Sequence, residues 1–431
     1  MPVTSLRKTS ARPPEVAKIK IKIKIKIKIK IKIKIKIKIK IKIKIKIKSK
    51  SKSKSKSKSK SKSGAAQRSS RFGPAQTKLY NPSKVPPPAV FSKRIPSMTH
   101  PLDIAVVGAT GSVGEALVQI LEELDFPVAT LHLLASMESA GSSVMFAGKK
   151  LKVREVDSFD FAQVKLAFFA AGAAVSRSFA SKALQAGCTV IDLSAGLDDA
   201  LALVPEANAE RLASLALPAR IVSPCSAAVA LAVALAPLKG LLDIERVQVM
   251  AALAVSAQGR EAVNELARQT AELLNARPLE PRFFDRQVAF NMLAQVGAAD
   301  EQGHTALERR LVGELRVLLG LPELKISVSC VQVPVFFGDS FSVAVQSRRP
   351  VDLDAVNQAL EAADSVELVE RDDYPTPVGD AVGQDVVYVG RVRHGVDEDQ
   401  QLNLWLTTDN VRKGAALNAV QVAQLLIKHM P

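Results

Sequence analysis

Cysteine is scarce in this sequence, which has only Cys188, Cys225 and Cys330 among its 431 residues. So few cysteines exclude a disulfide scaffold and predict a reducing, cytoplasmic environment. The five histidines form neither an HExxH motif nor a pairing with cysteine at zinc spacing, so we predict no metal site. Long apolar runs are missing too, since the longest, residues 227–238, falls short of the roughly 20 residues that span a bilayer.

Acidic residues are almost absent from the first part of the chain. Residues 1–97 hold 32 of the 60 lysines and arginines but a single acidic residue, Glu15. Residues 98–431 hold the other 28 basic residues and 41 of the 42 acidic ones, so this larger part is net negative. The overall charge of +18 therefore comes from one segment, and for residues 98–431 we expect neither nucleic acid nor a membrane as a partner.

The basic segment is a low-complexity tail. It alternates Ile with Lys over 19–48 and Ser with Lys over 49–62. Because every second residue of the repeats is a cation, repulsion opposes a packed core and predicts disorder. One interpretation is an amphipathic strand that lies on an anionic membrane or on nucleic acid. The other is an over-extended reading frame or a dispensable tail, since a six-base tandem repeat gives this pattern and ordinary sequence begins near Met98.

A glycine-rich turn follows, between a predicted strand and a predicted helix. Residues 103–107 are typical of a buried parallel strand, and residues 112–124 are amphipathic with a helical period. Gly108, Gly111 and Gly114 form a GxxGxxG pattern at their junction. Such glycines let the backbone approach a pyrophosphate, which the free N–H groups of a helix N-terminus stabilise. The strand–turn–helix context favours a dinucleotide site over a tight turn without a ligand.

The first half of the chain continues to alternate between strands and helices. Strands are predicted at 130–135, 166–171, 188–193 and 219–223, and helices near 176–186 and 205–214. This alternation implies a doubly wound, mostly parallel sheet. We therefore predict an α/β protein whose residues 98–228 form a Rossmann-type NAD(P)-binding domain.

Cys225 lies between the strand at 219–223 and an apolar segment that is typical of a buried helix. A thiol at a helix N-terminus feels the positive end of the dipole, which predicts a lowered pKa and a nucleophilic thiolate. The alternative is a small buried side chain, since free cysteine is often buried. Cys188 and Cys330 lie inside apolar runs, where we expect them to belong to the core.

After Gly240 the pattern changes to longer strands and longer polar helices. Strands are predicted at 245–256, 326–335, 341–347, 385–393 and 401–407, and helices at 260–275 and 305–319. This mixture indicates an α+β domain over 229–408 with an antiparallel or mixed sheet. The last segment, 409–431, is expected to end in a helix over 414–429 that packs back on the first domain.

Many short motifs occur in the order seen in aspartate-semialdehyde dehydrogenases, so the chain resembles that family over 101–431. The motifs are GATGSVG at 108–114, VID at 190–192, VPEAN at 204–208, PCS at 224–226, AFN at 289–291, VPVFFGDS at 333–340, YPTP at 374–377, VGRVR at 389–393 and DNVRKGAALNAVQ at 409–421. Each motif is weak alone, but their shared order is specific. The pattern is similar to the Usg-like branch of the family, whose members keep the fold without the full catalytic set.

The resemblance implies a function and a set of site residues. The family performs the reversible, NADPH-dependent reductive dephosphorylation of aspartyl phosphate to aspartate semialdehyde, in the biosynthesis of lysine, methionine and threonine. Its members form homodimers or tetramers through the second domain. By position, Cys225 is the nucleophile and Glu308 and Arg310 bind substrate; cofactor contacts fall on Gly108, Thr110, Gly111, Ser112, Val113, Gly114 and Asn410, with Lys413 and Gly414 close to the nucleotide.

The sequence departs from the family at the catalytic positions. Asp339 stands where the family has its acid/base histidine, and an aspartate is poorly suited to proton transfer near neutral pH unless burial raises its pKa. Gln332 replaces the arginine that clamps the substrate carboxylate. Leu253 replaces a glutamine near the cysteine, and Pro224 replaces an asparagine whose amide holds the acyl oxygen.

The cofactor end departs as well. Glu138 occupies a turn where the family often has arginine, and Asp198 stands where a phosphate-binding arginine is expected. A carboxylate repels a ribose 2′-phosphate but binds a 2′-hydroxyl, so the cofactor is NAD or NADP with NAD favoured. Two functions follow: a cysteine-dependent oxidoreductase for an aldehyde or acyl substrate, or a non-catalytic, dinucleotide-binding dimer with a structural or regulatory role.

Overall fold

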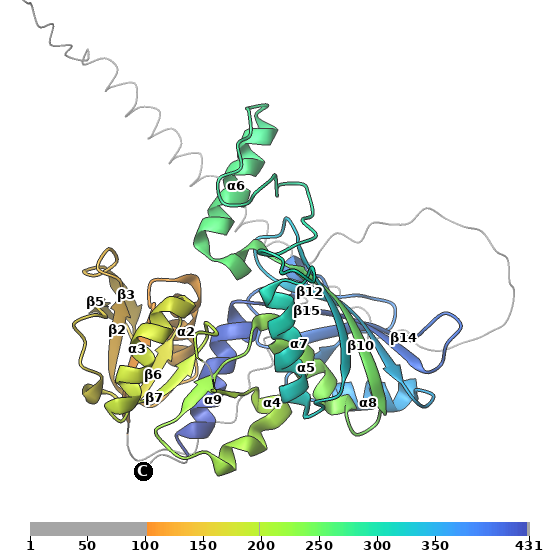
Figure 1. Ribbon diagram of the computed structural model, residues 1–431, viewed down its shortest axis with the longest axis horizontal. Coiled ribbons are helices and arrows are strands. Elements are labelled where there is room, and N and C mark those ends of the chain that lie inside the picture. The colour runs from red at the N-terminus through yellow and green to blue at the C-terminus, as the bar shows by residue number, and fades with distance from the viewer. Residues whose placement is uncertain (1–100, 198, 429–431) are drawn as a thin grey trace, which may run out of the picture. The chain divides into compact units, whose positions relative to one another are not determined.

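The computed structural model describes residues 101–197 and 199–428 (Figure 1). The predictions for the tail at 1–97 and for Asp198 lie outside these residues. Among the described residues, no helix is long and apolar enough to cross a membrane.

The first domain is built on a seven-stranded sheet in which every pairing is parallel. In spatial order its strands are β5 (Arg154–Glu155), β2 (Val128–Ala135), β1 (Leu102–Val107), β6 (Leu166–Phe169), β7 (Thr189–Asp192), β9 (Arg220–Val222) and β8 (Leu201–Ala202). A separate hairpin joins β3 (Ser143–Phe146) to β4 (Lys149–Lys152). The Rossmann-type prediction for this half is confirmed.

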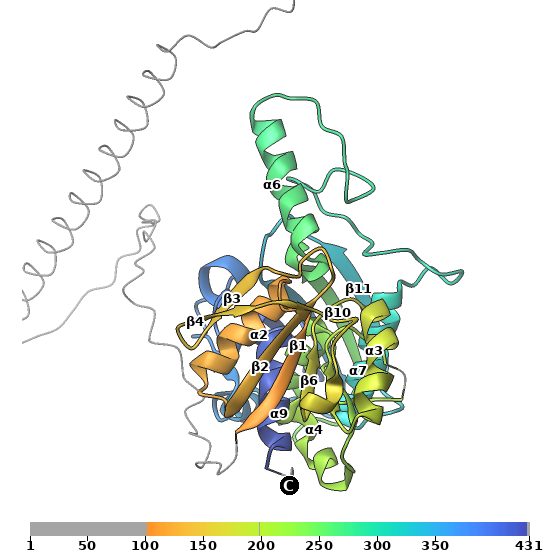
Figure 2. The same cartoon turned by 90° about the vertical axis from the view of Figure 1, so that its left-hand side faces the viewer.

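Helices cover both faces of this sheet (Figure 2). Alternate residues of β1 point to opposite faces, so Ile104 and Val106 belong to one core cluster and Ala105 and Val107 to another. Helix α2 (Ser112–Glu123) and the C-terminal helix α9 (Asn418–Leu426) line the first cluster, and α3 (Ala173–Gln185) lines the second. The closing helix α9 therefore packs against the first domain.

The second domain contains a six-stranded mixed sheet, as the α+β prediction requires. In spatial order its strands are β11 (Lys325–Gln332), β10 (Ile244–Leu253), β12 (Asp339–Ser347), β15 (Gln401–Thr408), β14 (Val387–His394) and β13 (Val366–Leu368). Its helices are α6 (Arg260–Leu274), α7 (Ala306–Leu319) and α8 (Leu353–Glu361). In both views α6 projects away from the sheet with the long loop that follows it (Figures 1 and 2).

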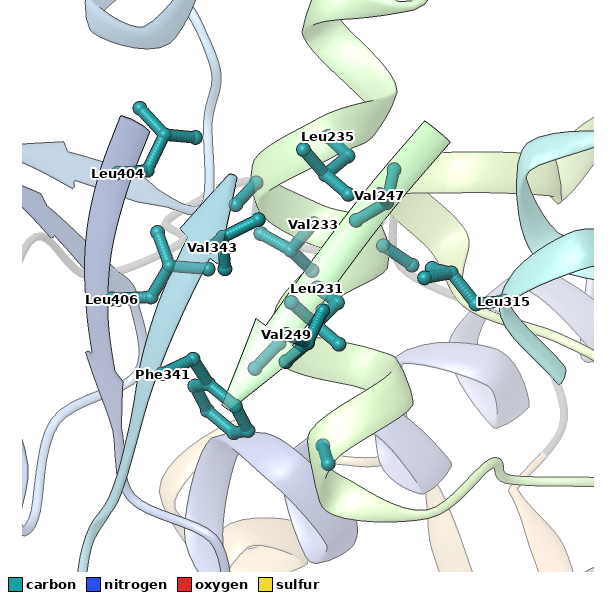
Figure 3. Packing of buried hydrophobic residues seen from close by; sticks show 14 of the residues in the cluster. Leu231, Val233, Leu235, Val247, Val249, Leu315, Phe341, Val343, Leu404 and Leu406 are labelled. Carbon is teal, nitrogen blue, oxygen red and sulfur yellow. The ribbon is translucent and has the colours of Figure 1, made fainter. Parts of the chain in front are cut away.

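Helix α5 (Ser226–Leu235) is the centre of the second core (Figure 3). Every residue from Ala227 to Leu235 is at most 2% exposed, and the sequence is a run of alanine, valine and leucine. A helix that is apolar on all sides must be surrounded by protein. It packs against strands β10, β12 and β15 and helix α7, through side chains that include Val249, Phe341, Leu406 and Leu315.

Three segments differ from the sequence-based predictions. The helix predicted at 205–214 is a short α4 (Pro205–Asn208) followed by the 3₁₀ segment η3 (Ala209–Ser214). The strand predicted at 245–256 ends at Leu253, where Ala254 turns into the 3₁₀ segment η5 (Val255–Gln258). The closing helix begins as a π-helical turn, η7 (Arg412–Leu417), before α9.

Candidate active site

The glycine loop has the geometry of a dinucleotide cradle. Gly108 has φ +85°, and a Cβ there would lie 2.7 Å from the Ala170 carbonyl oxygen. A Cβ on Gly114 would lie 2.1 Å from the Gly108 oxygen, so neither position tolerates a side chain. Gly111 is the N-cap of α2 and has no side chain to satisfy the first N–H groups, which leaves them free for an anion. The loop therefore fits a pyrophosphate. The other predicted cofactor residues, Thr110, Ser112 and Val113, lie in the same loop and at the start of α2.

Glu138 lies in the turn directly after β2. The Ser136 carbonyl accepts the N–H groups of Ser139 and Ala140, which closes the turn at the carboxyl end of the strand. Glu138 itself is exposed. An acidic residue after the second strand is where Rossmann domains read the ribose hydroxyls, so its position is compatible with the preference for NAD predicted from sequence.

Cys225 is the N-cap of α5, at the point where β9 has ended and the buried helix begins. The residue is partly exposed and packs against the second core. Its backbone N–H donates to the Glu314 carboxylate over 2.9 Å. A rigid helix and a carboxylate from α7 therefore hold this cysteine in place, whereas Cys188 and Cys330 are completely buried, as predicted.

The prediction of a lowered thiol pKa is wrong. Burial and the Glu314 carboxylate raise the pKa of Cys225 well above its usual range, and they outweigh the nearby Arg310 guanidinium, which lowers it. The helix N-terminus alone predicts the opposite direction. The difference arises because α7 brings a carboxylate to this thiol from 89 residues further along the chain, and a like charge disfavours the thiolate.

Arg310 and Glu314 form a pair on one face of α7. The Arg310 Nε donates to Glu314 Oε1 over 2.7 Å, at the i, i+4 spacing that places two side chains on the same face. The sequence motifs predict Arg310 as a site residue but do not point to Glu314. The signal that reveals Glu314 is this spacing, since a glutamate four residues after Arg310, a predicted substrate-binding residue, projects in the same direction.

Asp339 begins β12 and is completely buried. Its Oδ2 accepts the Ser226 hydroxyl over 3.0 Å, and its Oδ1 accepts the Ala254 N–H over 2.9 Å. Burial raises the pKa of Asp339 to about 7, although these two hydrogen bonds favour the ionised form. The carboxyl group is therefore next to the residue that follows Cys225, with a pKa suited to proton exchange at neutral pH.

Glu308 is held by the backbone on both sides. It forms a capping box with Thr305, in which its Oε2 accepts the Thr305 N–H over 2.9 Å, while its Oε1 accepts the Cys330 N–H over 3.0 Å. Burial raises its pKa, but the amides outweigh burial and the net pKa is lowered. The carboxylate therefore fixes the start of α7 against β11. Its role in substrate binding stays a prediction.

Gln332 is buried at the end of β11, beside a cavity of about 800 Å³. Its Nε2 donates to the Leu253 carbonyl over 2.6 Å, and its Oε1 accepts from Gln258 Nε2. The cavity is bounded on its other sides by the loop after α6, including Phe283 and Met292. The position that carries a cation in the family is thus neutral and hydrogen-bonded within the protein.

Residues of the C-terminal segment contact the residues that surround Cys225 and Asp339. Asn410 is buried, and its Oδ1 accepts the Gly338 N–H over 3.0 Å while the amide also bonds with Ser256. Gly414 lies so close to Ser226 that a Cβ on it would come within 2.6 Å of the serine Cβ. Lys413 is completely buried, with its Nζ 2.6 Å from Glu206. These contacts hold Asn410 and Lys413 within the protein, and cofactor binding by Asn410 stays a prediction.

Comparison with known proteins agrees with this geometry. Residues 103–215 match the semialdehyde dehydrogenase NAD binding domain, and residues 235–413 match the semialdehyde dehydrogenase dimerisation domain. The aspartate-semialdehyde dehydrogenase 2 of Vibrio cholerae is 40% identical over 334 residues, which cover 77% of this chain and 99% of that protein. This chain belongs to the aspartate-semialdehyde dehydrogenase family.

Within the family, the similarity is greater to the USG-1 protein homologues. That of Azotobacter vinelandii is 60% identical over 333 residues, which cover 77% of this chain and 99% of the relative. The structure of a probable aspartate-semialdehyde dehydrogenase from Pseudomonas aeruginosa is 59% identical, with a TM-score of 0.75 and coverage of 77% and 99%. A V. cholerae enzyme complexed with ASA is 40% identical with the same TM-score and coverage. The family resemblance and the expectation of a nicotinamide dinucleotide cofactor are confirmed.

Proposed function

We propose that this protein is an active, NAD-preferring dehydrogenase that oxidises an aldehyde, or reduces the corresponding acyl group, through Cys225. The observation that carries this proposal is the buried Asp339, whose pKa of about 7 restores a proton-exchanging group where the family histidine is missing. Cys225 supplies the nucleophile. The dinucleotide, when bound at the glycine loop, accepts or supplies the hydride.

The substrate class follows from the charges near Cys225. Gln332 is neutral, so the carboxylate clamp of the family is absent, while Arg310 keeps one cation close to the nucleophile. We therefore expect an aldehyde or acyl substrate with fewer anionic groups than aspartyl phosphate. By membership of the family, the pathway is amino-acid biosynthesis, and the active form is a homodimer or tetramer that assembles through the second domain.

Activity is expected to rise with pH through about 7. Asp339 accepts a proton only when ionised, so kcat follows its deprotonation. Asp339→Asn keeps the size of the side chain but should lower kcat about 10²–10⁴-fold and remove this step from the pH profile. Steady-state kinetics between pH 5.5 and 9 measure both effects. An unchanged profile in the variant would refute the role of Asp339.

Although Asp339→Asn should lose activity, it should be more stable than the wild type above pH 7. The folded-state pKa of Asp339 is raised above its ordinary value, so its contribution to stability is present in acid and is lost as the pH rises through about 7. Above pH 7 the wild type holds a buried anion that Asp339→Asn lacks. Thermal unfolding should therefore show a higher Tm for the variant at pH 8–9, which also demonstrates that any loss of activity is not a loss of fold.

Glu138 is expected to set the cofactor preference. Glu138→Arg removes the repulsion of a 2′-phosphate and adds an attraction, each worth about 1 kcal/mol for a solvated contact. Together they amount to about 2 kcal/mol, so the ratio of kcat/KM for NADP to that for NAD should rise up to about thirtyfold. Glu122→Arg, the same change at an exposed position of α2, is the matched control and should leave the ratio unchanged. Equal ratios in both variants would exclude Glu138 as the selecting residue.

A non-catalytic, dinucleotide-binding dimer is the second candidate function. It is favoured by the raised pKa of Cys225 and by Pro224, which removes a donor for the acyl oxygen. A folded protein that binds NAD but shows no turnover with any of a panel of aldehydes, with or without phosphate, would support this function. Turnover of aspartate semialdehyde at rates typical of enzymes would instead show that neither Asp339 nor Gln332 disables the site.

A further inference from the structure

The carboxylate of Glu314 connects the nucleophile to a cation. One oxygen accepts the backbone N–H of Cys225 over 2.9 Å, and the other accepts Nε of Arg310 over 2.7 Å. The negative charge of this carboxylate is one of the causes of the raised pKa of Cys225. Three groups from two helices, α5 and α7, therefore form one cluster: the thiol, the carboxylate and the guanidinium.

Two of the donors expected for an oxyanion, at Pro224 and at the backbone N–H of Cys225, are not free at this site. When a thiol attacks a carbonyl, the oxygen becomes negative and needs N–H donors that are already in place. Pro224 has no backbone N–H and no side-chain amide. The backbone N–H of Cys225 is already donated to Glu314. Neither Pro224 nor Cys225 therefore offers a free backbone N–H to the acyl oxygen.

One nitrogen of the Arg310 guanidinium, Nη2, is free to donate a hydrogen bond. This nitrogen is buried, and it has no hydrogen-bond partner among the described residues. A buried guanidinium nitrogen without a partner is unfavourable, and such groups in proteins usually meet a ligand or water. The positive charge of Arg310 also lowers the pKa of the Cys225 thiol. Its Nε is fixed by Glu314, so the orientation of the free nitrogen is fixed as well.

We propose that Arg310 is the oxyanion donor of this enzyme and that Glu314 accepts the thiol proton. The proposal rests on Cys225 as the nucleophile. The S–H bond of Cys225 breaks and its proton passes to Glu314, while sulfur forms a bond to the aldehyde carbon. The π electron pair of the carbonyl moves to its oxygen, which becomes an alkoxide hydrogen-bonded to Nη2 of Arg310. Return of the proton from Glu314 to this oxygen completes a thiohemiacetal.

The charges favour this exchange. Before attack, the positive Arg310 is paired with the negative Glu314. After attack, Glu314 is neutral and Arg310 is paired with the alkoxide, so the buried site keeps the same net charge throughout. A charge that only moves between two partners of one arginine avoids the cost of an unpaired buried ion. Asp339, beyond Ser226, then serves the later release of the acyl group, where it takes the proton of the attacking oxygen nucleophile.

Protection of the thiol from alkylation tests the oxyanion donor without turnover. The full-length protein is treated with iodoacetamide, with and without propanal, and modification of Cys225 is followed by peptide mass spectrometry. Propanal has no anionic group, so Arg310 can act only on its carbonyl oxygen. We expect the propanal concentration for half-protection to rise at least about tenfold in Arg310→Gln, with an intermediate value in Arg310→Lys. Arg309→Gln, at an exposed neighbour bonded to Asp300, should match the wild type.

A second measurement separates proton transfer from a structural role. Glu314→Gln removes the charge that raises the thiol pKa, so alkylation at pH 7 should become faster. Turnover should nevertheless fall, because the proton acceptor is lost. For Arg310→Gln we expect kcat to fall about 10²–10³-fold, as on removal of one oxyanion donor. A merely structural role of Glu314 would lower both rates together, and that result would refute the proton transfer.

The outcomes distinguish this inference from the proposed function. Equal protection by propanal in wild type and Arg310→Gln would overturn the oxyanion role while Cys225 remains the nucleophile. A rise in KM alone, with kcat unchanged, would also overturn it, because Arg310 would then bind only the ground state. If neither propanal nor aspartate semialdehyde protects the wild-type thiol, the proposed function fails and the inference fails with it.

Discussion

Replacement of Cys225 by alanine is expected to lower kcat/KM for aldehyde oxidation on the order of 10⁴-fold or more, since the covalent route is lost with the nucleophile. The change should leave the fold intact, because Cys225 is only partly buried and alanine is compatible with the start of α5. Dinucleotide reduction followed at 340 nm measures the rate. NADH binding, measured by its fluorescence, should be unchanged.

Cys188→Ala is the matched control for this prediction. Cys188 is completely buried in the first domain and belongs to the core cluster lined by α3. Its loss should lower stability slightly but leave the catalytic rate within about twofold, since it takes no part in nucleophilic attack. Equal losses of activity in the two variants would mean that the proposed activity depends on the fold and not on the Cys225 thiol.

Replacement of Lys413 by methionine is expected to lower the free energy of unfolding by about 3–5 kcal/mol, because it leaves a buried carboxylate without its partner. Lys413 is 0% exposed, and its Nζ lies 2.6 Å from Glu206 and 3.0 Å from Gln421. Urea or thermal unfolding measures the loss. Lys325→Met breaks an exposed pair with Glu245 at 3.7 Å and should cost no more than about 1 kcal/mol.

The same pair predicts a dependence on pH. Burial raises the pKa of Glu206, but Lys413 and two further hydrogen bonds outweigh burial and lower it, so this pair contributes stability above the ordinary pKa of glutamate and loses it in acid. Without Lys413, burial alone acts and the pKa of Glu206 rises. The difference between wild type and Lys413→Met should therefore be largest near pH 7 and shrink towards pH 4. A Glu206→Gln, Lys413→Met double variant should recover part of the loss, and failure to do so would exclude the ion pair as its cause.

The fold could be predicted where local pattern and burial agree. The strand at 102–107, the glycine turn and α2 follow from an apolar run, a spacing of glycines and a helical period. Helix α8 and the β3–β4 hairpin were not predicted, since short amphipathic segments resemble surface loops in a single sequence. The sequence predicted one helix where α4 and η3 are separate, and Leu212 of η3 belongs to the first core, a tertiary contact that local pattern does not show.

The sequence predicts which residues are candidates for the site, but it does not predict their pKa values. Motif order identified Cys225, Arg310 and Asp339, yet the pKa of each depends on neighbours that are distant in sequence. Glu314 reaches Cys225 across 89 residues, and Ala254 reaches Asp339 across 85. A helix N-terminus predicts an acidic thiol, and only the fold shows that a carboxylate reverses the direction. Burial of Asp339 likewise changes a poor acid/base group into one that titrates near neutrality.

The capping box at Thr305 and Glu308 restricts which changes of sequence this protein can accept at α7. It fixes the residue at which α7 begins. The number of residues from that start to Arg310 and to Glu314 then determines the side of the helix on which each side chain projects. One inserted or deleted residue between positions 308 and 314 would turn the later side chains by about 100° around the helix axis. A substitution in this segment therefore changes one side chain and leaves the others in place. An insertion or a deletion near the start of the segment would instead move both the Glu314 carboxylate and the Arg310 guanidinium away from Cys225. Divergence of the family at this helix is expected to proceed by replacement of side chains within a fixed length.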